Sequence, residues 1–452
     1  MIFSMLTKVP NRVLLVAAMA CGCQCVAWSQ VVPAKDGAMV TPPPVSVDSY
    51  PREVGSEARS NYLRLGMIFR GGYIDNLYAG SADSVVGETI LSVRPTIALD
   101  ATSYRQQETL LYSPGFTFYR PTGSLDVIDQ SVVFNFRFRL SPHQLIKANE
   151  NFQQGGSSFS PSSYGGGSGS SNTGVLAPFS NTLTNAANAE YSIQFSPADM
   201  FGISGTFYNL HYPDRSDAPG LYDSDEQGGA AFYSHRIAGN QYGGATYRFA
   251  RIRSYPQDAH SEVQTQAHTM YLFYTIYPKP GLSFSVSGGP QVYNSEYSLP
   301  GSTTAQTPTS TGYSWAPGAT ASMSWQQSHT NFTARYIHST SAGGGLLGTF
   351  DSNTASALVR WRASRNWTFG ASADYSILKS VTPLPFFSTN LGGHTLAGVA
   401  TVDHPFNAHF GAQFEYDHLH QSYAGVPVLL TNPDSNREMV SVYWQLARPL
   451  GR

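Results

Sequence analysis

The sequence has little charge, few cysteines and no long hydrophobic run. Charged residues make up 12% of its 452 residues, whereas about 25% is typical of a soluble protein. The three cysteines, Cys21, Cys23 and Cys25, all lie near the amino terminus, so the rest of the chain can form no disulfide. The apolar segments are too short for a membrane-spanning helix, which needs about 20 residues. These absences argue against an ordinary soluble protein, a disulfide-stabilised protein and a helical membrane protein.

The first 29 residues have the composition of a secretory signal peptide. Lys8 and Arg12 form its charged start, residues 13–20 form a short apolar core, and Ala27-Trp28-Ser29 is a small-x-small cleavage site. Removal of residues 1–29 takes away two cations and no anion, and the formal charge changes from -2 to -4. This balance predicts no nucleic-acid partner.

The cysteines of this leader allow two other interpretations. Cys21 could accept a lipid anchor, but the leucine that usually stands three residues earlier is replaced by Ala18. The run from Cys21 to Cys25 could bind a metal ion, but a signal peptide is discarded after export. We therefore expect neither feature in the mature protein.

Residues 30–60 predict an extended periplasmic arm. They contain Pro33, Pro51 and the run Pro42-Pro43-Pro44, and they show no periodic apolar pattern. An arm of about 30 residues is too short for a folded plug domain, which argues against an energised transporter.

Aromatic residues are abundant, at 13%, and many of them alternate with polar residues. Residues 131–140, SVVFNFRFRL, show this pattern most clearly. Alternate side chains of a strand point to opposite faces, so one face here is apolar and the other carries two arginines. The apolar face consists of Val132, Phe134, Phe136, Phe138 and Leu140, and the other face of Val133, Asn135, Arg137 and Arg139. This pattern is typical of a membrane barrel, with lipid outside and a wet lumen inside.

Similar segments recur very roughly every 20 residues from Tyr62 to Leu446, and their connections alternate between short and long. We count about 18 strands, with 16 as the alternative, an even number that places both ends on the periplasmic side. The predicted fold is all-β: a transmembrane up-and-down antiparallel β-barrel over residues 61–447, followed by a short tail, 448–452. Its turns are short on the periplasmic side and its loops are long outside. Pro95 interrupts one strand, and we expect a β-bulge there because proline lacks a backbone donor.

Several segments resemble bacterial outer-membrane porin-like barrels, a group of large and mostly uncharacterised proteins. They are SPGFTFYR (113–120), FRLSPHQ (138–144), FYTIYPKPGLSFSVSGGPQV (273–292) and the closing strand VSVYWQL (440–446). The resemblance implies a Gram-negative outer membrane, with its lipids, the barrel-assembly machinery and small hydrophilic solutes as partners, and a homotrimer as one assembly. In the family the chain commonly ends on an aromatic residue that the assembly machinery reads, whereas here residues 445–452 follow Trp444.

The longest low-complexity segment, residues 153–185, contains GGSSFSPSSYGGGSGSSNTG. It is the third long connection by our count, and porins of similar size often fold their third external loop into the lumen. The resemblance therefore implies a pore constriction at this loop. Its Gly- and Ser-rich composition also fits a disordered external loop, so both interpretations stay open.

The polar faces of the predicted strands collect charged side chains. The candidate pore-lining residues are Arg64, Arg70, Arg94, Arg137, Arg139, Arg248, Arg335, Arg360, Arg362, Asp374, Glu415 and Asp417. Charges inside a membrane barrel must be paired or hydrated, and an excess of arginine favours anionic solutes. The alternative is an internal salt-bridge network that fills the barrel.

The sequence contains no pattern typical of a metal site or of an enzyme. The four histidines His404, His409, His418 and His420 match no closed zinc pattern, and we expect no metal site and no cofactor. The sequence has no GxSxG, HExxH or phosphate-binding-loop motif and no GxGxxG after a strand, so we expect no enzyme. Trp315, Trp325, Trp361, Trp367 and Trp444 are expected to form interfacial girdles.

The sequence therefore predicts an outer-membrane channel for passive diffusion of small hydrophilic solutes, with anions as the favoured class. A first alternative is a non-conducting barrel that scaffolds the export of a surface polymer or binds a partner. A second alternative is a barrel-embedded hydrolase.

Overall fold

The computed structural model describes residues 61–77, 86–121, 126–155, 180–214, 220–255, 262–297, 309–381, 392–424 and 434–450. The predicted signal peptide and arm lie outside these described residues. The strands are β1 (Tyr62–Ile74), β2 (Glu88–Thr102), β3 (Gln106–Arg120), β4 (Val127–Ser141), β5 (Gln144–Gly155), β6 (Thr182–Gln194), β7 (Asp199–His211), β8 (Asp223–Ala238), β9 (Gln241–Tyr255), β10 (Val263–Lys279), β11 (Leu282–Tyr297), β12 (Thr309–Gln326), β13 (Thr330–Gly343), β14 (Leu346–Arg362), β15 (Thr368–Ser380), β16 (Gly392–Pro405), β17 (Phe410–Ala424) and β18 (Asp434–Pro449). No helix able to cross a membrane occurs in the described ranges.

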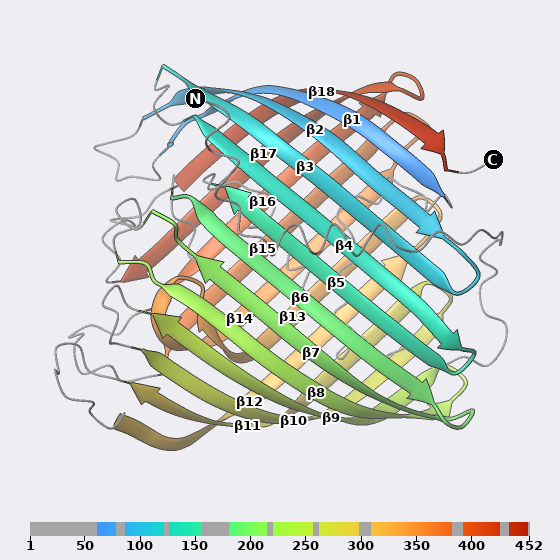
Figure 1. Cartoon of the computed structure of the whole chain (residues 1–452), viewed down its shortest axis with the longest axis vertical. Helices are drawn as coiled ribbons and strands as arrows, with labels where there is room; N and C mark the ends of the chain where they lie inside the picture. Colours follow the sequence, from blue (N-terminus) through green and yellow to red (C-terminus); the bar gives the residue numbers. More distant parts are fainter. Residues whose placement is uncertain are drawn as a thin grey trace.

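The strands form one closed antiparallel sheet, the wall of a barrel (Figure 1). Each strand pairs with its neighbours in the chain, and β1 pairs with both β2 and β18. At this closing seam between β1 and β18, Tyr62 lies opposite Pro449 and Ile74 lies opposite Arg437. The predicted up-and-down barrel of about 18 strands is confirmed.

The connections differ at the two ends of the barrel. At one end, the short-turn rim, they are two to five residues long, as at residues 280–281 between β10 and β11. At the other end, the long-loop rim, they are longer, except for Gly344-Gly345 between β13 and β14. Because the strand number is even, β1 begins and β18 ends at the same rim, the short-turn rim.

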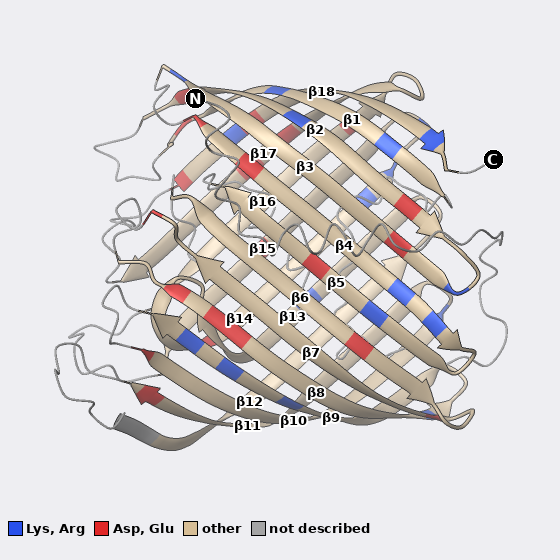
Figure 2. Cartoon of the chain, viewed as in Figure 1, with Lys and Arg blue, Asp and Glu red and all other residues tan. Residues whose placement is uncertain are grey.

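Small polar side chains are buried along the inner face, and charged ones are sparse on the strands (Figure 2). Ser234, Thr265 and Thr275 have no exposed surface, and the hydroxyl of Thr275 lies 2.8 Å from that of Ser285 on the neighbouring strand. The alternation of each strand places these side chains inside while the apolar ones point outward.

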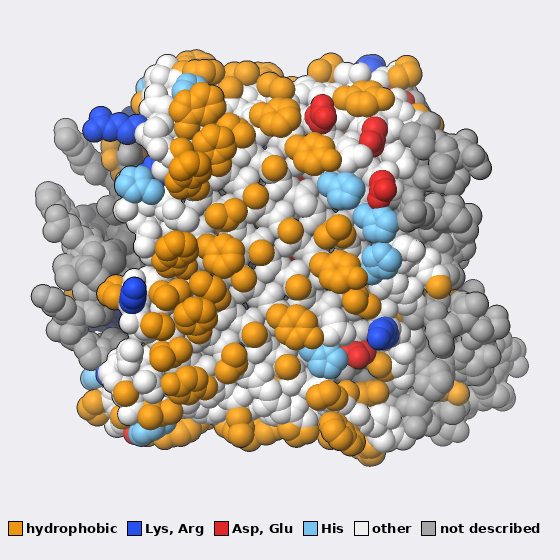
Figure 3. Space-filling view, turned by 180° about the vertical axis from the view of Figure 1, so that it is seen from behind, with side chains coloured by type: hydrophobic (Ala, Val, Ile, Leu, Met, Phe, Trp, Pro, Cys, Tyr) orange, Lys and Arg blue, Asp and Glu red, His pale blue; other side chains and the backbone are white. Residues whose placement is uncertain are grey.

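Large apolar side chains cover the outer face (Figure 3). On β4 the rings of Phe134, Phe136 and Phe138 stack in sequence with centroids 6.2 Å apart. Arg137 and Arg139 alternate with these rings and therefore point to the inner face. The faces predicted for residues 131–140 are confirmed.

Tryptophans mark the outer face near the short-turn rim. Trp325, Trp361 and Trp367 lie at strand ends there and are exposed, and Trp361 stacks on Phe369 with centroids 5.6 Å apart. Amphipathic rings at this level fit an aromatic belt at a membrane–water interface.

The β-bulge expected at Pro95 is absent. Pro95 lies opposite Met67 of β1 without a shift of register. On its other side, the pairs Val93–Phe116 and Ile97–Tyr112 keep one constant offset between β2 and β3. The prediction was wrong because the proline removes a backbone donor without adding a residue.

Candidate functional site: an inward-folded hairpin and the charged inner wall

The tip of the β13–β14 hairpin, Ser339–Phe350, lies inside the barrel. Every residue from Ser339 to Phe350 is buried, although a hairpin at the rim of a barrel is normally exposed. The two strands also contact β8, β9 and β10, which lie beyond β11 and β12 in the sheet. The tip therefore folds inward at the long-loop rim and crosses the inner face.

An apolar cluster holds this tip in place. Leu346, Leu347 and Phe350 of the tip pack against both sides of the barrel interior. The cluster consists of Leu210, Tyr212, Leu221, Val263, Leu346, Leu347, Phe350, Leu378 and Tyr423. Because Phe350 has no exposed surface, its burial favours docking of the tip by about 1.5–3 kcal/mol from transfer alone.

Hydrogen bonds fix the tip at its turn and at its β14 side. The carbonyl of Gly345 accepts from the backbone N–H of Tyr222 at 2.7 Å, and that of Thr349 accepts from Val381 at 3.0 Å. The hydroxyl of Thr349 is also hydrogen-bonded to that of Thr265 on β10. The tip is thus tied to the β7–β8 connection, to β10 and to the end of β15.

The glycines of the tip are required by the backbone and by close packing. Gly345 has φ +107°, a region that L side chains rarely adopt, and a Cβ there would lie 2.4 Å from the hydroxyl oxygen of Tyr212. A Cβ at Gly343 would meet the ring of Phe350 at 2.4 Å. The run of three glycines is therefore what lets the tip turn inside the barrel.

By alternation with the exposed outward side chains of the same strands, all the charged residues predicted to line a pore lie on the inner face, but at different places. Arg137 and Arg139 lie near the short-turn rim, at the end of β4. Arg360 and Arg362 lie near the same rim on β14, and Asp374 lies on the neighbouring strand β15, opposite Ser356. Together these residues do not form one cluster.

A seam cluster joins β17, β18, β1 and β2. The Arg437 guanidinium binds Asp417 at 2.7 Å and Glu415 at 3.2 Å through Nη2. Arg70 and Arg94 lie close enough for their charges to act on this cluster. Arg94 also faces Asp129 of β4 at 3.5 Å. Since Asp417 is 1% exposed, its charge depends on these cations.

The wall near the hairpin carries a different arrangement. Arg248 of β9 binds Glu226 of β8 at 2.6 Å. Within the described residues no ion pair involves Arg335 of β13, and the charged group that acts on it is a second cation, Arg248. This part of the inner wall therefore carries more positive than negative charge.

Sequence reasoning missed Arg437 and the inward tip. Arg437 follows the strand alternation of β18 and could have been added to the predicted set, but its two partners depend on the register with β17. The tip had a weak signal in GGGLLG, residues 343–348, because two leucines in an external connection need a place to be buried. The predicted constriction at residues 153–185 falls mostly outside the described residues, which include only its two ends.

No known protein family and no curated protein matches the sequence. Among solved structures, the ferric citrate transporter FecA in its unliganded form is 10% identical, with 84% of this chain and 63% of that chain covered and a TM-score of 0.42. Pseudomonas aeruginosa OccK2 (OpdF) is 10% identical, with coverages of 87% and 100% and a TM-score of 0.39. The siderophore receptor PiuA from Acinetobacter baumannii is 8% identical, with coverages of 86% and 82% and a TM-score of 0.43. The expected resemblance to outer-membrane barrels holds at the level of fold, and these scores carry no argument about function.

Proposed function

We propose that the chain is an outer-membrane channel through which small hydrophilic solutes diffuse passively. The observation that carries the proposal is the charged inner wall behind an apolar outer face. Charges such as Arg335 need water inside a membrane barrel. A wall of 16–18 strands is too wide for its own side chains to fill and leaves an aqueous channel in porins.

In this proposal the inward tip, Ser339–Phe350, narrows the channel near the long-loop rim. Its apolar cluster reaches from Leu210 and Val263 on one side to Leu378 and Tyr423 on the other. A solute entering from this rim would have to pass the tip before it meets Arg335 and Arg248.

Anions are the favoured solutes in this proposal. Arg335 has no carboxylate partner among the described residues, whereas the neighbouring Arg248 is paired with Glu226. A net positive field at a narrow point raises the local concentration of anions and lowers that of cations.

The proposal includes export by the predicted signal peptide and insertion by the barrel-assembly machinery into the lipids of the outer membrane. A homotrimer is the proposed assembly. Migration of the unheated protein on a gel tests both the barrel and the trimer, since a folded barrel and its oligomer each move differently from the heated chain.

Conductance in planar lipid bilayers tests the channel. Pure refolded protein is expected to give ohmic steps, and replacement of Thr340–Asp351 by Asn-Gly should raise the conductance roughly twofold or more, because the passage widens. Asn-Gly suits the two-residue turn that would join the paired residues Ser339 and Ser352. Leu272→Ala, on the exposed outer face, is the control and should leave conductance unchanged.

The outcomes separate the channel from the alternatives. No steps from either the native or the shortened protein would sink the proposal. Steps from the shortened protein alone would mean that the tip seals the barrel, as in the non-conducting alternative.

A further inference from the structure

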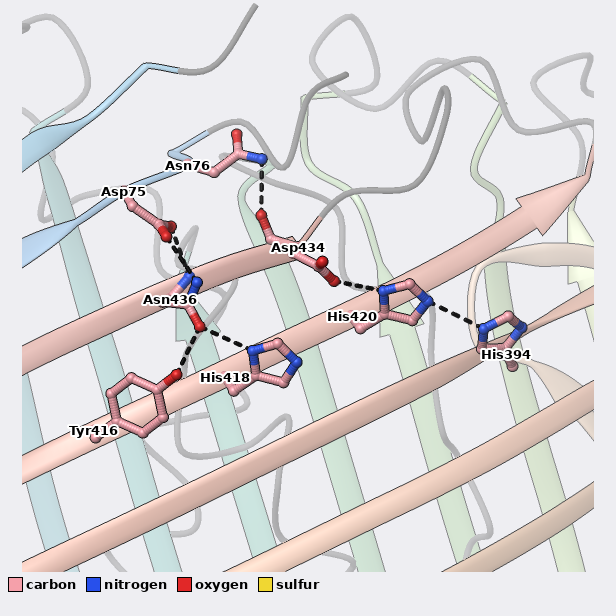
Figure 4. A network of polar contacts seen from close by, with 8 residues as sticks. All are labelled: Asp75, Asn76, His394, Tyr416, His418, His420, Asp434 and Asn436. Atoms are coloured by element: carbon pink, nitrogen blue, oxygen red, sulfur yellow. Dashed lines mark hydrogen bonds and ion pairs between the residues drawn. The ribbon is translucent and has the colours of Figure 1, made fainter. Parts of the chain in front are cut away.

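A polar network lies on the outer face of β16, β17 and β18, at the ends of these strands that border the long-loop rim (Figure 4). In it the Nδ1 atom of His420 lies 2.5 Å from the carboxylate of Asp434, and its Nε2 atom lies 3.2 Å from the Nε2 atom of His394. The backbone carbonyl of Asp434 accepts a hydrogen bond from the side-chain amide of Asn76 at 2.9 Å. This network is independent of the inner wall and of the proposed channel.

The register of β16 and β17 brings the two histidines together. Leu396 lies opposite His420, and His394 lies opposite Ser422, so His394 and His420 are diagonal neighbours on one face of the sheet. Leu396 is exposed, which identifies this face as the outer one. The sequence could not pair them, because a shift of one residue would turn one of the rings inward.

The geometry of the two rings suits a metal ion. A proton on Nδ1 of His420, donated to Asp434, leaves a lone pair on Nε2, and the same is possible for His394. Two nitrogens bound to a tetrahedral Zn²⁺ at about 2.0–2.1 Å lie about 3.3 Å from one another. The observed separation of 3.2 Å already matches this spacing.

We propose that His394 and His420 bind a divalent ion that prefers imidazole, Zn²⁺ in the first place, with Asp434 as the positioning residue. A carboxylate on the second ring nitrogen orients a ligating histidine and raises its basicity. No group of three or more potential metal ligands occurs among the described residues. The described residues thus supply two protein ligands, and we expect the ion to bind more weakly than in a closed four-ligand site.

His418 provides a matched control two residues away. It lies on the same face of β17 as His420, but its Nδ1 atom lies 2.9 Å from the side-chain oxygen of Asn436 (Figure 4). Among the described residues His418 has no ring contact with a second imidazole. Loss of His418 therefore removes an outward histidine of the same network without removing a ligand pair.

Calorimetric titration with ZnCl₂ of the untagged, refolded chain of residues 30–452, which lacks the cysteine-bearing leader, tests the site. We expect one saturable site, which His394→Gln or His420→Gln abolishes and His418→Gln leaves intact. Asp434→Asn should weaken binding about 10–100-fold, and binding should weaken as the pH falls because both imidazoles must be neutral. No saturable binding, survival of binding in both ligand variants, or equal loss in His418→Gln would each overturn the proposal.

A second measurement needs no variant and so does not depend on whether the variants fold. Diethyl pyrocarbonate modifies accessible imidazoles, and mass spectrometry locates the modified residues. In the native protein Zn²⁺ should protect His394 and His420 and leave the reactivity of His418 unchanged. The assignment would be overturned if Zn²⁺ left the reactivity of all three histidines unchanged.

Discussion

The charged side chains on two sides of the inner wall differ in whether they form ion pairs. In the seam cluster Arg437 is held by Glu415 and Asp417, whereas near the hairpin Arg335 has no ion pair among the described residues. A paired, buried charge links strands and contributes little field, because its partner cancels it. An unpaired charge must be hydrated and acts on any ion that passes. We therefore expect the seam cluster to stabilise closure of the barrel and, in the proposed channel, the wall beside the hairpin to select solutes.

The largest effect is expected from Arg437→Gln. The substitution leaves Asp417, which is 1% exposed, beside Glu415 without their shared cation. Breaking a buried ion pair in this way costs about 3–5 kcal/mol of the free energy of unfolding. The nearby charge of Arg70 also acts on Asp417, so we expect a value near the lower limit. Urea unfolding of the barrel in lipid vesicles measures this loss, and the gel shift on heating reports the fraction that is still folded.

Arg437→Lys is the control for this prediction. It keeps the positive charge but loses the second nitrogen of the guanidinium that reaches Asp417. The free energy of unfolding of Arg437→Lys should lie between that of the native chain and that of Arg437→Gln. If Arg437→Gln unfolds at the native urea concentration, the seam cluster does not hold the barrel closed.

The next largest effect is expected from Phe350→Ala in the hairpin tip. Truncation of a fully buried phenylalanine costs about 3 kcal/mol, and here the cost falls on docking of the tip, because the wall is closed without it. The backbone amides of residues 341–350 should therefore exchange with solvent about 100-fold faster, as mass spectrometry of deuterium uptake would show. Phe369→Ala, which removes an outward ring, should leave this exchange unchanged. Unchanged exchange in Phe350→Ala would mean that the cluster does not hold the tip.

The sequence predicts the facing of the strand residues in the barrel wall better than it predicts which segment folds into the interior. Alternation assigns each side chain to a face, so the outward rings of β4 and the inward arginines Arg137 and Arg139 follow from the pattern alone. Alternation says nothing about where a hairpin bends. The tip, Ser339–Phe350, continues two ordinary strands, and only its docking against residues distant in sequence, such as Tyr212, turns it inward.

The sequence likewise does not predict which charges of the inner wall are paired. A count of arginines on polar faces gives the composition of the inner wall but not which charges are paired. Whether Arg437 meets Asp417 depends on the register of β17 and β18, and a hydrophobic pattern specifies register only within a stable sheet. For this reason the alternatives of a pore and a salt-bridge network could not be separated from sequence. Among the described residues, the charges at the seam are paired and Arg335 near the hairpin has no ion pair.

A smaller effect, on selectivity, is expected from Arg335→Gln. Arg335 has no ion pair among the described residues, and removal of its charge changes the energy of a passing anion by about 1 kcal/mol. This corresponds to about fivefold in the permeability ratio of chloride to potassium. The reversal potential across a bilayer in a KCl gradient measures this ratio. Arg335→Lys keeps the charge and should keep the ratio. An unchanged ratio in Arg335→Gln would place the selectivity of the channel elsewhere.

The smallest effect is expected from Arg64→Gln near the short-turn rim. Arg64 binds Asp100 through two hydrogen bonds, of 2.6 and 3.0 Å, a fork like that of Arg437 with its acids. The side chain of Arg64 is 37% exposed, against 11% for Arg437, while that of Asp100 is 9% exposed. We therefore expect a coupling near the upper end of the roughly 0.2–1 kcal/mol that exposed ion pairs contribute. A double-mutant cycle of Arg64→Gln with Asp100→Asn, read by the same urea unfolding, should return a coupling within this range. A coupling as large as the loss in Arg437→Gln would show that the fork itself, rather than burial at the seam, determines how strongly an ion pair stabilises this wall.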